Sequence, residues 1–344
     1  MSKKKLAVIG YGLIGNKHAK IIENLENLEL CGVVENNQKL IKDFNLSCKV
    51  FSDIRELLKN QKVDGAIIAT PTPMHSEHAK IFLENKIPVL IEKPIANTSN
   101  EAEDLVNLSE KNSTEILVGH HRRHNNIISS AKKIIEEGQI GSIRSAISIC
   151  WFYKPDEYFD IAPWRKAKGA GPISINLIHD IDLMRYFCGE VKSVSAISKP
   201  SVRGYENEDL ASVILNFDNG VVANMTVSDS VVSPWSWETS SNENSEFPNS
   251  NQLCYLIGGS EGSLSIPELK IWKHQSKPDW TKSITNEKIF FESNNPLIDQ
   301  ILHFAKVIRK ETKPLVSGLE GLKSLKVIEA VQKSSIIKKI VEIE

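Results

Sequence analysis

The chain has 344 residues, of which 41% are hydrophobic and 25% charged, values typical of a folded globular protein. Lysine and arginine number 42 against 43 aspartates and glutamates, which gives a formal net charge of −1. This balance excludes a strongly basic surface for nucleic acid or an anionic membrane, so we expect neither partner. The length predicts two domains.

The cysteines and the first residues of the chain indicate the cellular compartment in which the protein is expected. Five cysteines are spread at irregular distances without a C-x-x-C motif, which is typical of reduced, mostly buried thiols. Lys3–Lys5 and the apolar Leu6–Ile9 imitate a signal peptide, but the apolar run is short and no small-x-small cleavage site follows. We therefore expect a cytoplasmic protein.

From residue 6 to about 120, short apolar runs alternate with segments of helical periodicity. The predicted strands are Leu6–Ile9, Leu30–Val34, Lys49–Phe51, Val63–Ala69, Val89–Ile91 and Glu115–Val118. The predicted helices are Ile14–Asn27, Asn37–Phe44, Asp53–Lys59, Met74–Glu84 and Ser99–Lys111. Such alternation predicts an α/β domain, residues 1–121, with a parallel sheet covered on both faces.

After residue 120 strands dominate. The predicted strands are Ile143–Phe152, Val191–Ser198, Leu210–Phe217, Val221–Ser230, Leu253–Ile257, Ser263–Ile266, Leu269–Lys273 and Ile284–Phe291. One strong helix, Ile173–Phe187, precedes most of them, and helices Pro296–Lys310 and Leu319–Lys333 close the chain. Turn signals between successive strands indicate a large open, mainly antiparallel sheet in an α+β domain, residues 122–344. The C-terminal helices are candidates for packing back on the first domain.

A glycine motif follows the first predicted strand and opens a helix. The residues are Gly10, Tyr11, Gly12, Leu13, Ile14 and Gly15, which match G-x-G-x-x-G. Gly10 permits a tight turn, Gly12 lets the backbone approach a pyrophosphate, and Gly15 allows close packing of helix on strand. The motif predicts a dinucleotide whose phosphates bind the helix N-terminus. An ordinary glycine-rich turn is the alternative.

Glu35 ends the second predicted strand, 20 residues after Gly15. At this distance an acidic residue accepts a hydrogen bond from a ribose 2′-hydroxyl. Its carboxylate would also repel a 2′-phosphate, and no arginine follows it. We therefore predict NAD(H) in preference to NADP(H).

Two loops follow predicted strands at the edge where open parallel sheets bind ligands. Thr70-Pro71-Thr72 follows one strand, and Thr70 and His75 could line the cofactor. Glu92-Lys93-Pro94 follows the next strand, where Lys93 is a candidate donor to a reacting oxygen. A surface lysine at a strand end is an equally good interpretation of Lys93 taken alone.

Five parts of the sequence together are similar to the Gfo/Idh/MocA oxidoreductases. They are Gly10–Gly15, Glu35, Glu92-Lys93-Pro94, the run from Val118 to Asn125, and the block from Gly171 to Asp182 with His179 in H-x-x-D. The family includes inositol dehydrogenases and glucose–fructose oxidoreductase, and the resemblance spans nearly the whole chain.

The resemblance implies a Rossmann domain and a second domain whose open sheet mediates contacts in a homodimer or homotetramer. It also implies that Lys93 binds the reacting hydroxyl and the nicotinamide ribose, and that His179 takes the substrate proton. Among further residues, Thr70, Pro71, Thr72, His75 and Glu92 would contact the cofactor. Trp164-Arg165 resembles a segment that approaches the cofactor, and Arg123 could touch cofactor or substrate.

One position departs from the family pattern. Many inositol-dehydrogenase-like members carry an aspartate four residues before the helix histidine, where this chain has Ile175. Asn176, three residues before His179, can share its helix face but supplies no negative charge. We therefore expect Asn176 to take part in catalysis by orienting groups.

The remaining candidates are a metal site and a substrate loop. His120, His121 and His124 lack the spacing of a zinc site, and a hydride acceptor needs no metal, so we expect none. The segment 233–252 resembles a lid, on which Trp237 and Glu238 could contact a polyol. A loop held in place by buried tryptophans is the alternative.

These observations predict an NAD-dependent oxidoreductase that acts on a secondary alcohol of a sugar, cyclitol or related polyhydroxy compound. Two other classes on the same scaffold stay open. One is a glycosidase that uses a tightly held NAD, and the other is a sugar-pathway regulator that binds the dinucleotide without turnover.

Overall fold

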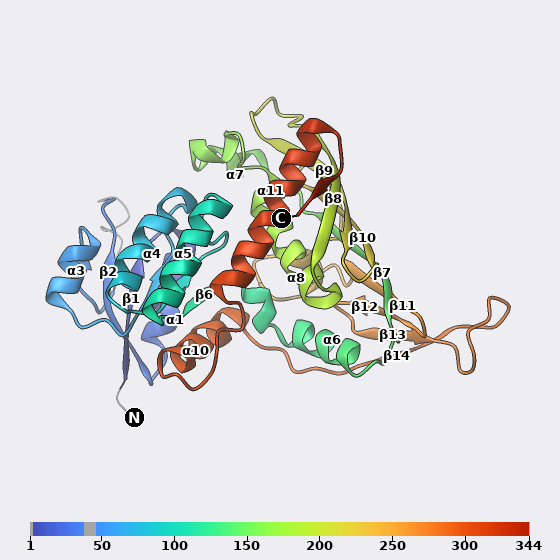
Figure 1. Ribbon diagram of the computed structural model, residues 1–344, viewed down its shortest axis with the longest axis horizontal. Helices are drawn as coiled ribbons and strands as arrows, with labels where there is room; N and C mark the ends of the chain where they lie inside the picture. The colour runs from blue at the N-terminus through green and yellow to red at the C-terminus, as the bar shows by residue number, and fades with distance from the viewer. Residues whose placement is uncertain (1–2, 38–45, 344) are drawn as a thin grey trace. The chain divides into compact units, whose positions relative to one another are not determined.

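The computed structural model describes residues 3–37 and 46–343 (Figure 1). Almost all of the helix predicted over Asn37–Phe44 therefore lies outside the described residues. The chain forms two compact units, one of Met1–His124 with Asn295–Leu325, the other of Asn125–Asn294 with Lys326–Glu344. Each unit has its own hydrophobic core.

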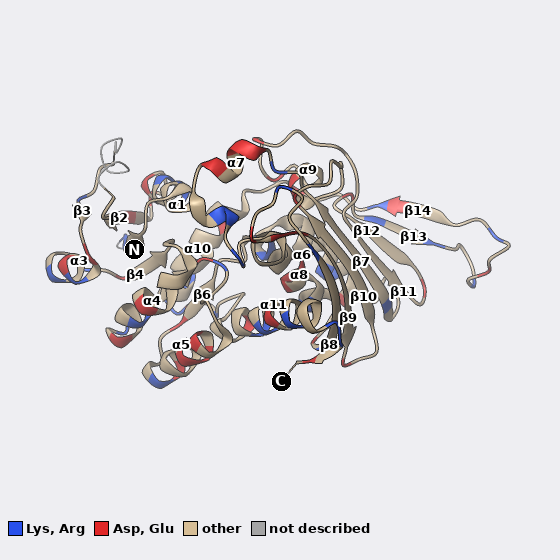
Figure 2. Cartoon of the chain, turned by 90° about the horizontal axis from the view of Figure 1, so that it is seen from above, with Lys and Arg blue, Asp and Glu red and all other residues tan. Residues whose placement is uncertain are grey.

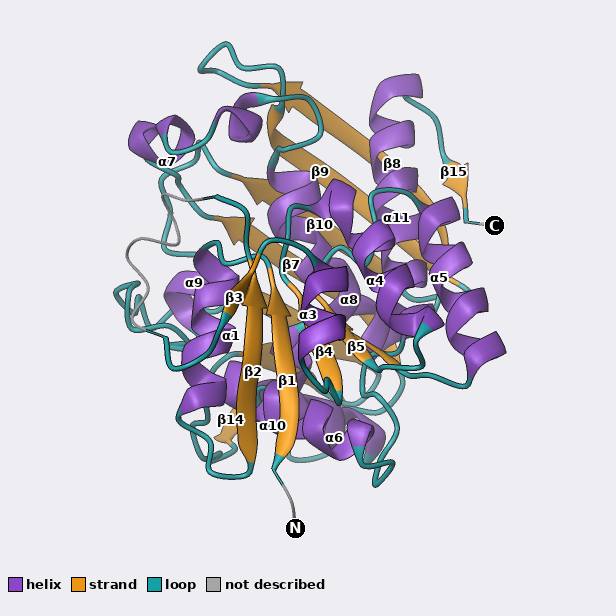
Figure 3. Cartoon of the chain, turned by 90° about the vertical axis from the view of Figure 1, so that its left-hand side faces the viewer, coloured by secondary structure: helices purple, strands orange, loops and turns teal. Residues whose placement is uncertain are grey.

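The first unit is built on a parallel sheet of six strands in the order β3-β2-β1-β4-β5-β6. The strands are β1 (Lys4–Ile9), β2 (Leu28–Val34), β3 (Val50–Phe51), β4 (Gly65–Ile68), β5 (Val89–Ile91) and β6 (Ile116–Val118). Figure 3 shows β2 and β1 side by side and pointing the same way. The chain order reverses between β1 and β4, which makes their carboxyl ends a binding crevice for a ligand.

Helices cover the sheet of the first unit. They are α1 (Leu13–Glu23), α3 (Ile54–Asn60), α4 (His75–Glu84), α5 (Ser99–Asn112) and α10 (Pro296–Ile308). Three begin at side-chain caps: Glu56 N donates to Asp53 Oδ1 at 2.8 Å, Glu101 N to Thr98 Oγ1 at 3.3 Å, and Leu297 N to Asn295 Oδ1 at 3.1 Å. The strands beneath are apolar except for Lys4 and Lys5 at the start of β1 and Glu29 in β2, and Leu6–Ile9 are completely buried. This explains why short apolar runs predicted the strands of this unit.

The first unit is completed by the C-terminal part of the chain. Ile301 and Phe304 of α10 are fully buried in the same core as β1, and Val118 N of β6 donates to Val316 O at 2.8 Å. Helix α11 (Gly318–Ile337) begins in this unit and ends in the other. Helix α10 and the first part of α11 therefore belong to the first unit.

The second unit is built on a nine-stranded sheet in the order β14-β13-β12-β11-β7-β10-β9-β8-β15. The strands are β7 (Ile143–Trp151), β8 (Val191–Pro200), β9 (Glu208–Phe217), β10 (Val222–Ser228), β11 (Tyr255–Gly259), β12 (Ser263–Ile266), β13 (Lys270–Lys273), β14 (Thr285–Lys288) and β15 (Val341–Glu342). All neighbours are antiparallel except β7 and β10. The long connection through helices between β7 and β8 permits that one parallel pair.

Two helical segments in this unit differ from the prediction. The amphipathic helix α6 (Asn126–Glu136) was not predicted, although Ile127, Ile128 and Ala131 are buried along one face. The predicted helix over Ile173–Phe187 is a π-helical turn (Ile173–Leu177) followed by α8 (Ile178–Cys188). A π turn commonly marks a functional position in a helix.

Two further observations concern the whole described chain. No helix among residues 3–37 and 46–343 is long and apolar enough to cross a membrane. The five cysteines carry thiols, and all but Cys48 are buried. Burial raises the pKa of Cys31 and of Cys188 to about 12, so these thiols stay protonated.

Candidate functional site

The glycine loop joins β1 to α1 at the carboxyl edge of the first sheet. Gly10 has a φ of +87°, and a Cβ there would lie 2.8 Å from Thr70 N. A Cβ on Gly15 would lie 2.1 Å from Gly10 O, so the helix can pack this closely only on glycine. A Cβ on Gly12 would meet nothing within 4 Å, and both Gly12 and Leu13 are exposed. The loop therefore has an open cradle above Gly12 that fits a pyrophosphate.

Glu35 lies directly after β2 and holds its carboxylate against this loop. Oε2 accepts from Tyr11 N at 2.9 Å, while Oε1 accepts from Asn36 N at 2.9 Å and Asn37 N at 2.8 Å. These three backbone donors fix the position of the carboxylate. Oε1 already accepts two hydrogen bonds, but Oε2 accepts only one and keeps a second lone pair, so the group can still accept from a ribose hydroxyl.

The loop after β4 carries the next predicted contacts. Thr70 and Thr72 are half-buried and Pro71 is exposed, where a ligand can reach them. His75 is only 1% exposed, and its Nδ1 and Nε2 lie 2.8 Å from Pro94 O and Thr70 O. Its imidazole thus joins two loops at the sheet edge instead of facing a bound molecule. Burial lowers the pKa of His75 against the effect of the two carbonyl oxygens.

Glu92 and Lys93 follow β5 and point to different environments. Glu92 is buried, and its Oε1 lies 2.7 Å from Nε2 of the fully buried His18 on α1. Although desolvation opposes ionisation, the hydrogen bond and charge of His18 lower the pKa of Glu92 overall. Glu92 therefore ties the Lys93 loop to the glycine-loop helix, and its side chain is not placed to contact a cofactor. Lys93 is half-buried at the crevice edge.

The histidine-rich run after β6 forms a 3-10 turn, His121–His124. Arg123 is 4% exposed, with Nη2 at 3.8 Å from Glu320 Oε2. The rings of His124 and His303 lie 5.2 Å apart, and burial lowers the pKa of His124 to about 3. Among the residues that the structure describes, no group of three His, Cys, Asp or Glu side chains could hold a metal ion.

In the second unit, Trp164 and Arg165 lie on a 3-10 turn, Pro163–Lys166. The Trp164 side chain is 53% exposed. The Arg165 guanidinium lies 4.0 Å from the Tyr158 ring centroid, and Nη1 donates to Tyr158 O at 2.7 Å. The pair is thus presented on the surface of its unit by stacking and a backbone hydrogen bond, and its role toward the cofactor stays a prediction.

His179 and Asn176 occupy the segment where the π turn passes into α8. Asn176 is 8% and His179 7% exposed. Glu208 of β9 holds the start of this segment, because Ile173 N donates to Glu208 Oε1 at 3.1 Å. Gly171 is required here, since a Cβ would lie 2.2 Å from the same oxygen. Burial raises the pKa of Glu208.

The segment 233–252 contains a short helix, α9 (Trp237–Ser240), and is tied to its unit. Trp237 is 2% exposed, stacks on Tyr255 with ring centroids 5.8 Å apart, and donates from Nε1 to Glu243 Oε2 at 3.2 Å. The predicted substrate contact through Trp237 is therefore replaced by a core position. Glu238 is half-buried beside it, with Oε2 enclosed by the protein.

Two residues near these groups were missed by the sequence analysis. His18 has no signal beyond its place on the helix after the glycine motif. Lys154 lies between Tyr153 and Pro155 just past β7, and its Nζ donates to Asn176 Oδ1 at 2.8 Å. The lysine–proline pair after a strand repeats the pattern of Lys93, and that repetition was the available signal.

A Rossmann-type sheet, a glycine cradle, and an acidic residue fixed beside it define a dinucleotide-binding domain. Residues 4–120 match the family described as "Oxidoreductase family, NAD-binding Rossmann fold", and residues 128–265 match the "GFO/IDH/MocA C-terminal domain". The chain belongs to the Gfo/Idh/MocA family of oxidoreductases. It is an NAD(P)-dependent dehydrogenase acting on CH–OH groups, and both the resemblance and the predicted fold class are confirmed.

Two similar proteins from Bacillus subtilis (strain 168) span nearly the whole chain. The scyllo-inositol 2-dehydrogenase (NAD(+)) is 26% identical over 341 residues, covering 94% of this chain and 91% of that protein. The scyllo-inositol 2-dehydrogenase (NADP(+)) IolW is 23% identical over 352 residues, covering 99% and 96%. The name of the first enzyme gives NAD(+) as its cofactor, and the name of the second gives NADP(+).

A solved structure shares the fold. The WlbA dehydrogenase from Bordetella pertussis, in complex with NADH and UDP-GlcNAcA, aligns with a TM-score of 0.82 at 21% identity and covers 100% of this chain and 98% of that one. This likeness extends the fold assignment to the full length of the chain.

Proposed function

We propose that the protein is an NAD(H)-preferring dehydrogenase that transfers a hydride between nicotinamide and a secondary alcohol of a sugar, cyclitol or related polyhydroxy compound. The observation that carries this proposal is the fixed Glu35 carboxylate beside the open cradle of Gly12, at the same sheet edge as Lys93. The names of the two relatives, both dehydrogenases of scyllo-inositol, support the substrate class.

The preference for NAD(H) rests on Glu35. A carboxylate held by three backbone N–H groups cannot turn away from the loop, so a 2′-phosphate there would meet a fixed negative charge. One of the two relatives is named for NAD(+) and the other for NADP(+), so their names do not predict the cofactor of this chain. The preference is therefore inferred from this chain's own residues.

Bound nicotinamide dinucleotide supplies the hydride acceptor or donor. The protein supplies the groups that act on the alcohol. Lys93 donates to the reacting oxygen and stabilises its alkoxide character, and His179 takes its proton as a general base. Asn176 orients groups near His179 and does not ionise.

Single substitutions of Lys93 and His179 test the proposal. In a screen of polyols, cyclitols and sugars for NADH formation, Lys93→Met and His179→Ala should each lower turnover by roughly 10²-fold or more. NADH affinity, measured by fluorescence titration, should change far less. The double variant should lose less than the product of the single losses if both residues serve one reaction.

The same assays distinguish the other two classes. Sugar release without net NADH, by a protein that keeps NAD through purification, would support a glycosidase. A parent protein that binds NADH but turns over none of the compounds would support a regulator. Variants that lose NADH binding and activity together would make Lys93 and His179 structural residues.

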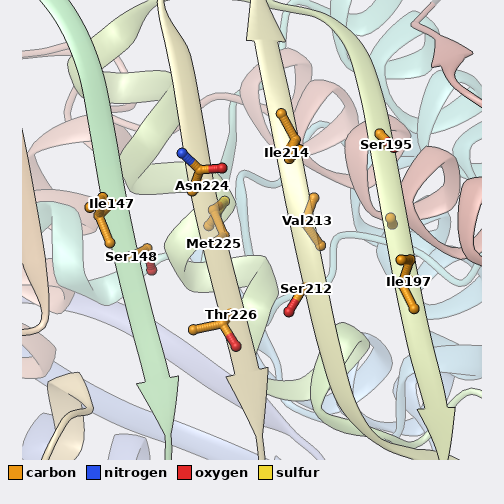
Figure 4. Close-up of a pocket in the computed structure, with 11 residues that line it drawn as sticks. Ile147, Ser148, Ser195, Ile197, Ser212, Val213, Ile214, Asn224, Met225 and Thr226 are labelled. Atoms are coloured by element: carbon orange, nitrogen blue, oxygen red, sulfur yellow. The ribbon is translucent and has the colours of Figure 1, made fainter.

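We also propose that the face of the second sheet on which Ile147, Ile197 and Ile214 are exposed mediates homodimer or homotetramer contacts. Figure 4 shows Ile147, Ile197 and Ile214 among small polar residues on four neighbouring strands, lining a shallow hollow of about 350 Å³. Figure 2 shows these strands mostly tan, and their central residues 145–151, 193–198, 210–217 and 222–228 include no Lys, Arg, Asp or Glu. Ile214→Lys should lower the assembled mass in light scattering while NADH affinity is kept; an unchanged mass in this folded variant argues against the face.

A further inference from the structure

Lys154 is a buried lysine that none of the roles above uses. Its side chain is 7% exposed and follows β7 in the second unit. Lys154 N donates to Asp229 O at 2.9 Å, and Arg203 Nη2 donates to Lys154 O at 2.7 Å, so the backbone is held from both sides. Nζ lies 2.8 Å from Asn176 Oδ1 and 3.5 Å from Asp229 Oδ2. The ammonium group is therefore fixed between a carboxylate and the Asn176 amide.

This contact determines which way the Asn176 amide points. A lysine ammonium carries three donors and no acceptor, so only the carbonyl oxygen of the amide can face it. The NH₂ group of Asn176 must then point away from Lys154. Within the part of the chain that the structure describes, this NH₂ donates to no protein acceptor. Asn176 is thus a prepared hydrogen-bond donor, three residues before His179.

The electrostatic surroundings favour this arrangement. Burial lowers the pKa of Lys154, while Asp229 raises it by opposing charge. Asp229 also lies 3.5 Å from Arg203 Nη1, so two cations share this buried carboxylate. The neutral amide of Asn176 offers its oxygen to Lys154, so this hydrogen bond orients the amide without changing the charge of the cluster.

We propose that Lys154 is a positioning residue that fixes Asn176 as a donor to an oxygen of the substrate. The inference rests on the proposed function, because that function places the substrate near His179. It adds to it a chemical requirement, since the substrate group at Asn176 must accept a hydrogen bond. Hydroxyl, carbonyl and carboxylate oxygens meet this requirement, and an ammonium group does not.

A double-mutant cycle tests whether Lys154 acts through Asn176. Lys154→Met and Asn176→Ala should each lower kcat/KM for the best polyol of the screen by about 10–100-fold, the value of a well-placed hydrogen bond to substrate. The double variant should fall little further than Asn176→Ala alone. NADH affinity should stay at the parent value. Lys132→Met, which removes another hydrogen-bonded lysine of the same unit, is the control and should leave activity unchanged.

Asn176→Asp tests the direction of the donor. Its carboxylate can pair with Lys154 and keep the fold, but it cannot donate to the substrate. We expect activity at or below that of Asn176→Ala, with a melting temperature close to the parent. An Asn176→Asp variant with parent activity would show that no donor is needed at this position and overturn the inference.

The other outcomes are also decisive. Losses in kcat/KM that multiply in the double variant would give Lys154 a role of its own and overturn the positioning role. The same cycle on unfolding should show a coupling of roughly tenfold in the unfolding constant, and its absence would refute the contact. If the parent oxidises none of the compounds, the proposed function fails together with the substrate-facing part of this inference, while the unfolding cycle still decides the contact.

Discussion

In the glycine loop, we expect Gly15→Ala to lower stability and Gly12→Ala to lower NADH affinity, although both substitutions add a single methyl group. In Gly15→Ala the new Cβ would lie 2.1 Å from Gly10 O, so helix and loop must part by more than about 1 Å to reach an ordinary contact of roughly 3.5 Å. The obstructing atom belongs to the backbone and cannot rotate away. We estimate a cost of about 3 kcal/mol, of which roughly 1 kcal/mol returns as helix propensity.

The net loss of about 2 kcal/mol should lower the melting temperature of Gly15→Ala by roughly 4–8 °C for a domain of this size. In Gly12→Ala the Cβ meets nothing within 4 Å, and the backbone, with φ of −66°, suits any residue. Its stability should stay within about 0.5 kcal/mol of the parent. Its methyl group stands where the pyrophosphate approaches, so NADH affinity should fall by about 10–100-fold.

Differential scanning calorimetry without ligand and fluorescence titration with NADH measure the two effects. Gly12→Ala should be stable and bind poorly, and Gly15→Ala should be unstable. A Gly12→Ala protein that binds NADH as tightly as the parent would refute the assignment of this loop to the pyrophosphate. A Gly15→Ala protein with the parent melting temperature would refute the close packing of α1.

Three further predictions follow from burial and charge. Glu35→Arg should shift the ratio of kcat/KM toward NADP(H), and a parent enzyme that already uses both cofactors equally would show that Glu35 does not discriminate. His124 is neutral when buried, with a pKa of about 3, and gains a proton on unfolding below its ordinary pKa of about 6.5, so stability should decrease as the pH falls through this window. Between neutral pH and pH 5, the free energy of unfolding of His124→Phe, measured by urea unfolding, should decrease by on the order of 2 kcal/mol less than that of the parent. An equal decrease in both proteins would contradict a buried, neutral His124. Trp237→Ala should cost about 3–5 kcal/mol because the ring is in the core, whereas the exposed Trp164→Ala should keep the melting temperature and weaken NADH binding; the reverse pattern would exchange their roles.

Local signals predicted the first unit well because its strands are buried on both faces. Runs such as Leu6–Ile9 are wholly apolar, and glycines mark the turn that follows. The same signals missed α6, where Asn125 caps the helix through its side chain and Ile127 begins the apolar face. That helix directly follows the polar run of histidines and arginines, so no change in composition marks its first residue.

Long-range contacts account for the candidate-site residues that sequence reasoning misjudged. Trp237 was given to the substrate because it lies in a loop rich in serine and asparagine, yet its partner Tyr255 comes from a strand beyond that loop. Asn176 was identified from its spacing to His179, but its orientation depends on Lys154, 22 residues away. Spacing along a helix can be read from sequence, whereas a contact that bridges two elements depends on how the sheet pairs.

The first unit is discontinuous in the chain, because it is left at His124 and resumed at Asn295. During synthesis, more than three hundred residues must leave the ribosome before Ile301 and Phe304 can fill the core beneath β1. Until then the nascent unit exposes the apolar surface that these side chains cover. A fragment ending at residue 124 would carry this defect permanently. The outgoing and returning segments run side by side, since Asn126 N donates to Asn294 Oδ1 at 2.9 Å. A short glycine linker from His124 to Asn295 would therefore give a self-contained cofactor-binding module.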